Sequence, residues 1–275
     1  MLLPRLITAI IGIPLVALAV YWGGVPFLIL MFGVVFLSLR EFFFLAGQGK
    51  YNAQPVLGII TGLIFLISIF LNGTALGAAG ENQGTSAVLT LLLIPLYARE
   101  MLRKPLDRAI ERISITFFGS FFIAWTLGHL LLLRNLQPAG MGYVYFLIGI
   151  IWLLDTGAYA VGVRFGKRKL AETVSPKKTI EGALGGTVVA ILAALVCRLL
   201  FLRENITVFE AVFAGLFISV IAQFSDLSES LLKRDVGVKD SANLLPGHGG
   251  MLDRFDSFLF TAPLFYYYLT IFKHS

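Results

Sequence analysis

Long apolar segments, separated by short polar breaks, run through the whole 275-residue chain. Most of them approach the length of about 20 residues that an α-helix needs to cross the hydrocarbon core of a bilayer. Glycine, proline, asparagine and charged residues gather in the breaks, where helices are expected to end. The pattern therefore predicts an all-α polytopic membrane protein with about nine transmembrane helices. The nine segments are Ile7–Tyr21, Val25–Leu39, Val56–Leu71, Ala87–Tyr97, Ile113–Leu133, Tyr143–Val163, Ile180–Leu202, Phe209–Leu232 and Phe255–Phe272.

Two of these segments have alternative interpretations. The fourth is short and could be re-entrant. The first ends near Ala17-Leu18-Ala19, which is similar to a signal-peptidase site. Only Arg5 precedes it, and a second apolar segment follows almost at once, so we expect an uncleaved first span.

Composition supports the membrane class. Hydrophobic residues make up 57% of the chain and charged residues 14%, whereas soluble domains average about 45–50% and about 25%. The single cysteine, Cys197, excludes an intramolecular disulfide and a Cys-based metal site. A net charge of +6 could suit nucleic acid, but basic loops in a polytopic protein first report topology. We therefore expect no nucleic-acid partner.

Lysine and arginine are unevenly distributed over the breaks. With nine spans and the N-terminus inside, eighteen of the twenty-two lie on the inside face. The four on the outside are Arg134, Arg198, Arg203 and Lys273. Because inside loops carry the excess of Lys and Arg, we expect a cytoplasmic N-terminus and a C-terminus outside. Removing one span would scramble this alternation, so the short fourth segment is expected to cross.

Three sections of the chain are expected. Residues 1–84 hold the first three transmembrane helices, and residues 85–140 hold the fourth and fifth with a cytoplasmic amphipathic segment. Residues 141–275 hold helices six to nine, where the candidate catalytic residues lie. The amphipathic segment, 99–112, is broken at Pro105. We expect a surface helix that touches anionic lipid headgroups, with a gate for a lipid substrate as the alternative.

Two pairs of carboxylates stand out in the apolar C-terminal part. Asp226 and Glu229 are three residues apart and share a helix face, and Asp253 and Asp256 repeat that spacing. An ionised Asp in a span costs about 2.5–3.5 kcal/mol, so it usually faces a cavity or a partner. Four such groups on two neighbouring helices could converge on one cation, and hard oxygen ligands suit Mg²⁺. In the simpler alternative, these acids pair with their basic neighbours, Lys233, Arg234 and Arg254.

A glycine-rich loop lies between the two pairs, at Pro246-Gly247-His248-Gly249-Gly250. Glycines let the backbone approach a ligand and expose N–H groups, and a helix N-terminus follows. His248 could contact a phosphate or carry a proton, or it could be a plain hydrogen-bonding residue. Lys233, Arg234 and Lys239 add positive charge nearby, although they could serve only as inside anchors.

Two further features lie upstream. Ser175-Pro176-Lys177-Lys178-Thr179-Ile180-Glu181-Gly182 places two lysines and flanking hydroxyls at the mouth of a helix, which suits a triphosphate. Asp155 lies in the middle of a span, where an acid is a functional hypothesis by default. An interhelical hydrogen bond is the alternative for Asp155. Gly182 and Gly186 form a Gly-x-x-x-Gly pattern that favours helix packing.

The segment from Ser225 to Asp256 resembles the signature of the phosphatidate cytidylyltransferases, the CDP-diacylglycerol synthases. Residues 175–182 and the segment around Asp155 also resemble this family. Ser225 departs from the pattern, which has Gly before the Asp, although a small residue is kept. The matching positions are Ser230, Lys233-Arg234, Lys239-Asp240, Pro246-Gly247-His248-Gly249-Gly250, Asp253-Arg254 and Asp256.

The resemblance implies an enzyme of the cell membrane that joins phosphatidic acid to CTP with Mg²⁺ at the cytoplasmic face. The products would be CDP-diacylglycerol and pyrophosphate, and a second cation is compatible with this chemistry. An oxygen of the lipid phosphate would attack the α-phosphorus of CTP. Because that phosphate is already ionised, positioning and charge neutralisation would do most of the work.

The same resemblance implies the roles of individual residues. The expected catalytic residues are Asp226, Asp253, Asp256, Lys233, Arg234 and His248. The expected metal ligands are Asp226, Asp253, Asp256 and, with less support, Glu229. The expected substrate-binding residues are Ser175, Lys177, Lys178, Thr179, Glu181, Lys239, Asp240, Gly249, Gly250 and Asp155.

Two other functions remain open from the sequence. A CTP-dependent lipid kinase would attack the γ-phosphorus instead and release CDP. An ion-coupled transporter would use Asp155 and Asp226 as coupling sites, but most acids gather at the inside ends of the spans beside glycines and lysines. Besides CTP, phosphatidic acid and membrane lipids, a second copy of the chain is a candidate partner, since small residues in the seventh segment could pack a homodimer.

Overall fold

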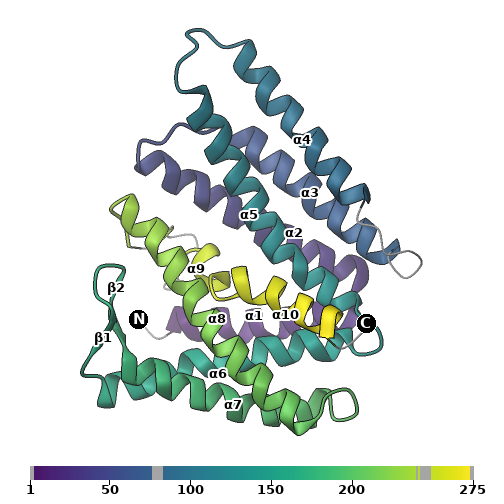
Figure 1. Ribbon diagram of the computed structural model, residues 1–275, viewed down its shortest axis with the longest axis vertical. Helices are drawn as coiled ribbons and strands as arrows, with labels where there is room; N and C mark the ends of the chain where they lie inside the picture. Colours follow the sequence, from purple (N-terminus) through teal and green to yellow (C-terminus); the bar gives the residue numbers. More distant parts are fainter. Residues whose placement is uncertain (1–2, 76–82, 240, 242–248, 273–275) are drawn as a thin grey trace. The chain divides into compact units, whose positions relative to one another are not determined.

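The computed structural model describes residues 3–75, 83–239, 241 and 249–272 (Figure 1). Helices make up most of this part of the chain, and every apolar segment predicted from the sequence coincides with a helix. The helices are α1 Leu3–Trp22, α2 Gly24–Gln48, α3 Pro55–Ala75, α4 Gln83–Met101, α5 Ala109–Asn135, α6 Gly140–Phe165, α7 Ile180–Phe201, α8 Val208–Asp235, α9 Leu252–Phe255 and α10 Phe258–Phe272.

Six of the described helices are long and apolar enough to cross a membrane. They are α2, α3, α5, α6, α7 and α8. Helix α10 has 15 residues, and only the Ile10–Trp22 part of α1 stands out as a shorter apolar helix. A helical, polytopic membrane protein is therefore confirmed, while the count of nine spans and the orientation of the termini remain predictions.

The purely helical expectation missed a small β-hairpin between α6 and α7. Strands β1 Lys169–Ala171 and β2 Ser175–Thr179 pair antiparallel, with Lys169 opposite Thr179 and Ala171 opposite Ser175. Thr179 ends β2 and also caps α7, because its hydroxyl accepts a hydrogen bond from the backbone N–H of Gly182 at 3.1 Å. The hairpin therefore fixes the position of the two lysines of β2, Lys177 and Lys178, just before α7 begins.

The chain divides into two compact units. Unit 1 comprises Met1–Asn135 and Asp235–Phe255, and unit 2 comprises Leu136–Arg234 and Asp256–Ser275. In unit 1, α3 packs on α5, α2 packs on both, and α9 contacts α2. Small residues allow the helices to pack closely. A Cβ on Gly62 would clash with Leu39 of α2, and one on Gly119 would clash with Phe42 of α2. The core of unit 1 is therefore built from close helix contacts at glycines.

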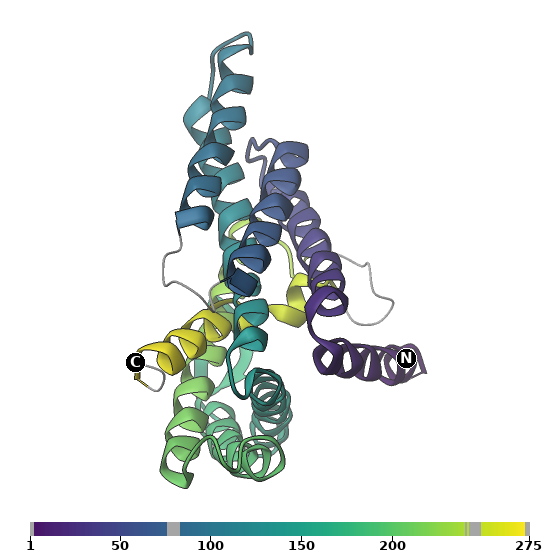
Figure 2. The ribbon, with the colours of Figure 1, turned by 90° about the vertical axis from the view of Figure 1, so that its right-hand side faces the viewer.

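Unit 2 is built around the pair α6 and α7, which run side by side (Figures 1 and 2). A Cβ on Gly182 would lie 2.8 Å from the carbonyl oxygen of Ala158, and one on Gly186 would lie 2.9 Å from the Cβ of Ala158. The packing role predicted for this Gly-x-x-x-Gly pattern is confirmed. Helix α8 then packs on α7 at Gly215.

The amphipathic segment 99–112 is interrupted around Pro105 and has buried ends. Helix α4 ends at Met101 and α5 begins at Ala109, so the middle of the segment is not a helix. Arg112 and Glu100 do not face lipid headgroups: their side chains are 2% and 4% exposed and pair at 2.8 Å. The break predicted at Pro105 is therefore present, and a buried ion pair joins the two ends of the segment. Contact of the exposed middle of the segment with lipid headgroups stays a prediction.

Candidate functional site

Asp226 lies on α8 in unit 2 and forms an ion pair with Lys178 of β2. The two side chains are 25% and 30% exposed, so solvent reaches both charges. Ser230, one turn later on α8, lies with its hydroxyl 3.5 Å from Oδ1 of Asp226. The structure therefore brings together a carboxylate and a lysine that are 48 positions apart in the chain.

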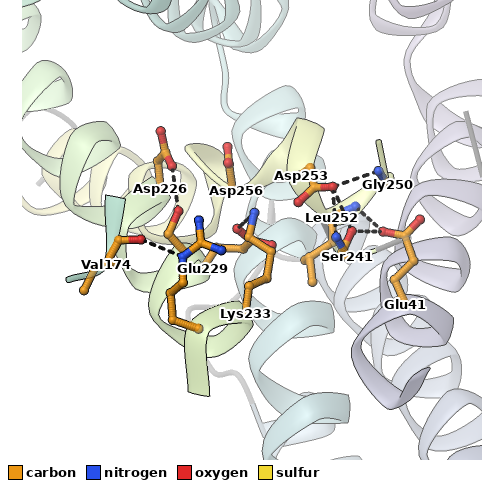
Figure 3. Close-up of polar contacts among 12 residues, drawn as sticks. Glu41, Val174, Asp226, Glu229, Lys233, Ser241, Gly250, Leu252, Asp253 and Asp256 are labelled. Carbon is orange, nitrogen blue, oxygen red and sulfur yellow. Dashed lines mark hydrogen bonds and ion pairs between the residues drawn. The ribbon is translucent and has the colours of Figure 1, made fainter. Parts of the chain in front are cut away.

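Glu229 is more deeply buried on the same helix. Its Oε2 atom lies 2.5 Å from Nζ of Lys233, and the side chains are 1% and 9% exposed (Figure 3). The structure thus forms the simpler alternative that the sequence left open for this acid. A carboxylate already neutralised by a buried lysine is a weaker candidate for a metal ligand than Asp226.

Asp256 lies in the turn between α9 and α10, and α8 holds this turn in place. The hydroxyl of Ser225 donates a hydrogen bond to the carbonyl oxygen of Asp256 and accepts one from the N–H of Phe260 at 3.2 Å. Burial, followed by the nearby negative charges of Asp226 and Glu229, raises the pKa of Asp256 well above its usual range. The carboxyl group of Asp256 therefore experiences repulsion from the neighbouring acids, and a bound cation would reduce that repulsion.

The donor set of unit 2 fits Mg²⁺. Among the described residues, no three His, Cys, Asp or Glu side chains lie close enough together to hold a metal ion. Mg²⁺ does not need three, because it keeps several waters and usually takes one or two carboxylates with substrate phosphates. Asp226 and Asp256 offer two such carboxylates of hard oxygen character, and their shared negative charge favours a divalent cation.

The β-hairpin presents basic groups beside Asp226. Lys177 is exposed, Ser175 is half-buried, and Lys178 makes the ion pair with Asp226. Nε of Arg234, at the end of α8, donates a hydrogen bond to the carbonyl oxygen of Val174 at 3.1 Å (Figure 3). Arg234 therefore ties the hairpin turn to α8 in this structure.

Glu181 has a defined structural role at the start of α7. Its carboxylate accepts hydrogen bonds from the backbone N–H groups of Lys167 at 2.9 Å and Arg168 at 3.1 Å. It also accepts one from Nε of Arg168 at 3.3 Å. With Thr179 acting as the cap of α7, two of the residues predicted to bind substrate hold the hairpin in shape.

In unit 1, Asp253 organises the end of the glycine-rich segment. Its Oδ2 atom accepts hydrogen bonds from the N–H of Gly250 at 2.8 Å, and from the hydroxyl and N–H of Ser241 at 3.0 and 3.2 Å. Gly249 has a positive φ of 78°, which favours glycine. Lys239 is exposed. Asp253 thus fixes the local backbone, whatever else it binds.

Glu41 of α2 is the residue that sequence reasoning missed. Its side chain is 1% exposed and faces the same segment of unit 1 (Figure 3). It accepts hydrogen bonds from Met251 N–H, Leu252 N–H and the Ser241 hydroxyl, at 2.7, 2.8 and 2.9 Å. Glu41 lies two residues beyond the predicted end of the second apolar segment, but residues 42–46 are apolar again, so the acid interrupts an apolar stretch. Such an acid is a signal for a functional or paired group. That signal could have found Glu41, just as it found Asp155.

Three predicted site residues, Asp155, Asp240 and His248, remain. Asp155 lies on α6 with an exposed side chain, and its charge also contributes to the raised pKa of Asp256. Asp240 and His248 lie outside the described residues.

Comparison with known proteins gives consistent matches along the chain. The sequence model of the family described as "Cytidylyltransferase family" matches residues 3–272. A phosphatidate cytidylyltransferase of Bacillus subtilis is 33% identical over 270 residues, which cover 98% of each chain. Relatives with the same name from Staphylococcus saprophyticus and Staphylococcus aureus are 34% and 33% identical over 264 residues, or 94% of this chain and 96% of theirs.

Proposed function

The chain belongs to the cytidylyltransferase family, and from that premise we propose that it transfers the cytidylyl group of CTP to phosphatidic acid. The products are CDP-diacylglycerol and pyrophosphate. The observation that carries this proposal is the similarity to phosphatidate cytidylyltransferases over nearly the full length of the chain. The six apolar helices support a reaction in a membrane, where the lipid substrate resides.

The bonds that form and break in this reaction indicate what the basic residues do. An oxygen of the lipid phosphate forms a bond to the α-phosphorus of CTP, and the bond from that phosphorus to the pyrophosphate oxygen breaks. Lys177 and Lys178 of β2 neutralise the phosphate charges that meet in this step. Because Lys178 pairs with Asp226, it is already held at the carboxylate site. Lys233, Arg234, Lys239 and His248 are the further basic candidates.

Asp226 and Asp256 of unit 2 are the residues that would hold Mg²⁺. Asp253 remains a further ligand candidate from the sequence pattern. When bound, the cation neutralises phosphate oxygens and favours departure of pyrophosphate. Glu229 is a weaker ligand candidate, because Lys233 neutralises it. Ser175, Asp155, Asp240, Gly249 and Gly250 remain candidates for substrate contact, whereas Thr179 and Glu181 would act by holding the hairpin.

The distribution of Lys and Arg supports a cytoplasmic active site in the cell membrane, since eighteen of these residues fall on one face of a nine-span arrangement. We propose that α1, α4 and α10 complete the nine spans, with the N-terminus inside and the C-terminus outside. In this arrangement residues 141–275 supply most of the catalytic groups. CTP would reach the site directly from the cytoplasm.

The test follows a label from the α-phosphate of CTP. Purified protein is mixed with phosphatidic acid, Mg²⁺ and the labelled CTP. Label is expected in the lipid fraction, and it should be lost with EDTA and in Asp253→Asn, but not in the control Glu204→Gln, which alters an exposed acid. Label that remains in CDP would instead establish a lipid kinase. No turnover by a folded preparation would overturn the proposal and favour a transporter.

A further inference from the structure

A buried acid of α2 holds the segment that carries Asp253. Glu41 lies about 200 positions before that segment in the sequence and has only 1% of its side chain exposed. A carboxylate in such a place is costly unless hydrogen bonds compensate for its lost hydration. The described neighbours of Glu41 supply that compensation from one short stretch of chain.

Among the described residues, three donors reach Glu41 from the segment of Asp253, and they use both of its oxygens. Oε1 accepts from the N–H of Met251 at 2.7 Å, while Oε2 accepts from the N–H of Leu252 at 2.8 Å and from the hydroxyl of Ser241 at 2.9 Å. Backbone N–H groups at the start of a helix have no intrahelical acceptor. Glu41 therefore satisfies the backbone where α9 begins.

Ser241 connects Glu41 to Asp253. Its hydroxyl lies 2.9 Å from Oε2 of Glu41 and 3.0 Å from Oδ2 of Asp253. A hydroxyl has a single proton to donate, so the two carboxylates share this donor, as the close-up shows (Figure 3). Movement of Glu41 would therefore change the hydrogen bonding of Asp253.

Gly250 shows how tightly this connection is packed. A Cβ at this position would overlap both the Ser241 hydroxyl and the Glu41 carboxylate. The N–H of Gly250 also donates to Asp253 at 2.8 Å. Only glycine leaves room for the two acids and the serine around this backbone.

We infer that Glu41 is a positioning residue that sets the orientation of Asp253 through Ser241 and the backbone of residues 250–252. This inference rests on the proposed function, in which Asp253 serves the transfer reaction. It adds a residue of α2 to catalytic groups that otherwise come from the C-terminal half of the sequence.

The test uses full-length protein and the conservative variant Glu41→Gln. Its amide nitrogen cannot accept a hydrogen bond, so at least one donor loses its partner. Hydrogen–deuterium exchange of the peptide covering residues 249–256 reports on these same N–H groups and is expected to become faster. The value of kcat should fall about 10- to 100-fold, as for other groups that orient a ligand, and the Mg²⁺ concentration for half-maximal rate should rise.

Two further variants separate positioning from folding. Glu41→Asp keeps the charge and should recover part of the activity, whereas Ser241→Ala removes only the shared hydroxyl and should change exchange and rate in the same direction as Glu41→Gln. Glu204→Gln serves as the charge control and should leave both unchanged. Thermal unfolding in detergent is measured for every variant, so that a loss of rate is read only from folded protein.

If hydrogen–deuterium exchange of residues 249–256 is unchanged in Glu41→Gln and Ser241→Ala, the inference is overturned. Faster exchange with wild-type kcat and Mg²⁺ dependence would also overturn it, because the contact would then serve the fold alone. A wild-type protein that forms no CDP-diacylglycerol would count against the proposed function instead. In that case the exchange measurement would still decide whether Glu41 holds the segment.

Discussion

Nζ of Lys233 lies 2.5 Å from Oε2 of Glu229, one turn apart on α8, with side chains that are 9% and 1% exposed. Each charge is thus compensated by the other in a nearly dry environment. Removing one partner of such a pair leaves an uncompensated charge and typically costs about 3–5 kcal/mol. Lys233 therefore has a structural role, the neutralisation of Glu229, in addition to the catalytic role proposed for it.

We expect Lys233→Met to lower the free energy of unfolding by about 3–5 kcal/mol, measured by denaturant titration in detergent. The double variant Lys233→Met with Glu229→Gln should regain much of that stability, since neither charge remains. If Lys233 also neutralises phosphate, the double variant should stay inactive although it folds. Recovery of both stability and activity would show that Lys233 acts only through Glu229.

Asp226→Asn is expected to lower the reaction rate strongly while changing the stability little. The ion pair of Asp226 with Lys178 is partly exposed, and such pairs contribute about 1 kcal/mol or less. Unfolding should therefore change little, while the rate of cytidylyl transfer should fall by about 10²–10³-fold, as when one electrostatic contact to a reacting group is removed. The rate is measured at saturating CTP, and near wild-type turnover would remove Asp226 from the metal site.

The buried pair of Arg112 and Glu100 predicts a large effect on stability in unit 1. Nε of Arg112 also donates to both oxygens of Glu100, at 3.0 and 2.8 Å, and the amide of Gln54 donates to the same carboxylate at 2.6 Å. Arg112→Met should cost about 3–5 kcal/mol of unfolding free energy.

Arg108→Met is the matched control for this prediction, because Arg108 is 61% exposed and lies 3.6 Å from Glu111. It should cost about 1 kcal/mol or less. Equal effects of the two substitutions in the same denaturant titration would contradict the assignment of Arg112 as a buried structural residue.

Ser225 should matter through its hydroxyl rather than through its size. In Ser225→Ala, the carbonyl oxygen of Asp256 and the N–H of Phe260 each lose the hydrogen bond to the Ser225 hydroxyl, at a cost of about 1–3 kcal/mol. Ser225→Gly should cost about 1 kcal/mol more, because glycine is unfavourable inside a helix. Both variants should also slow the transfer reaction if Asp256 needs this anchor. A stable, fully active Ser225→Ala would contradict that role.

The sequence by itself determined the helices and their class. Apolar segments such as 113–133 and 143–163 have the length at which a helix crosses a bilayer, and a helix satisfies its backbone hydrogen bonds internally, so α5 and α6 could be predicted with nearly correct bounds. The spacing of Asp226 and Glu229 likewise placed both acids on one helix face. These features depend on local periodicity and length, which a sequence displays directly.

Only the tertiary structure decided which charges meet. Lys178 reaches Asp226 because a β-hairpin, formed by a short polar stretch without a strong strand pattern, carries it to α8. Lys233 pairs with Glu229, although the sequence offered several bases to several acids. Glu41 reaches Ser241 and the backbone of residues 251–252 across about 200 positions of sequence. Such long-range pairings depend on how helices pack, and no local pattern encodes them.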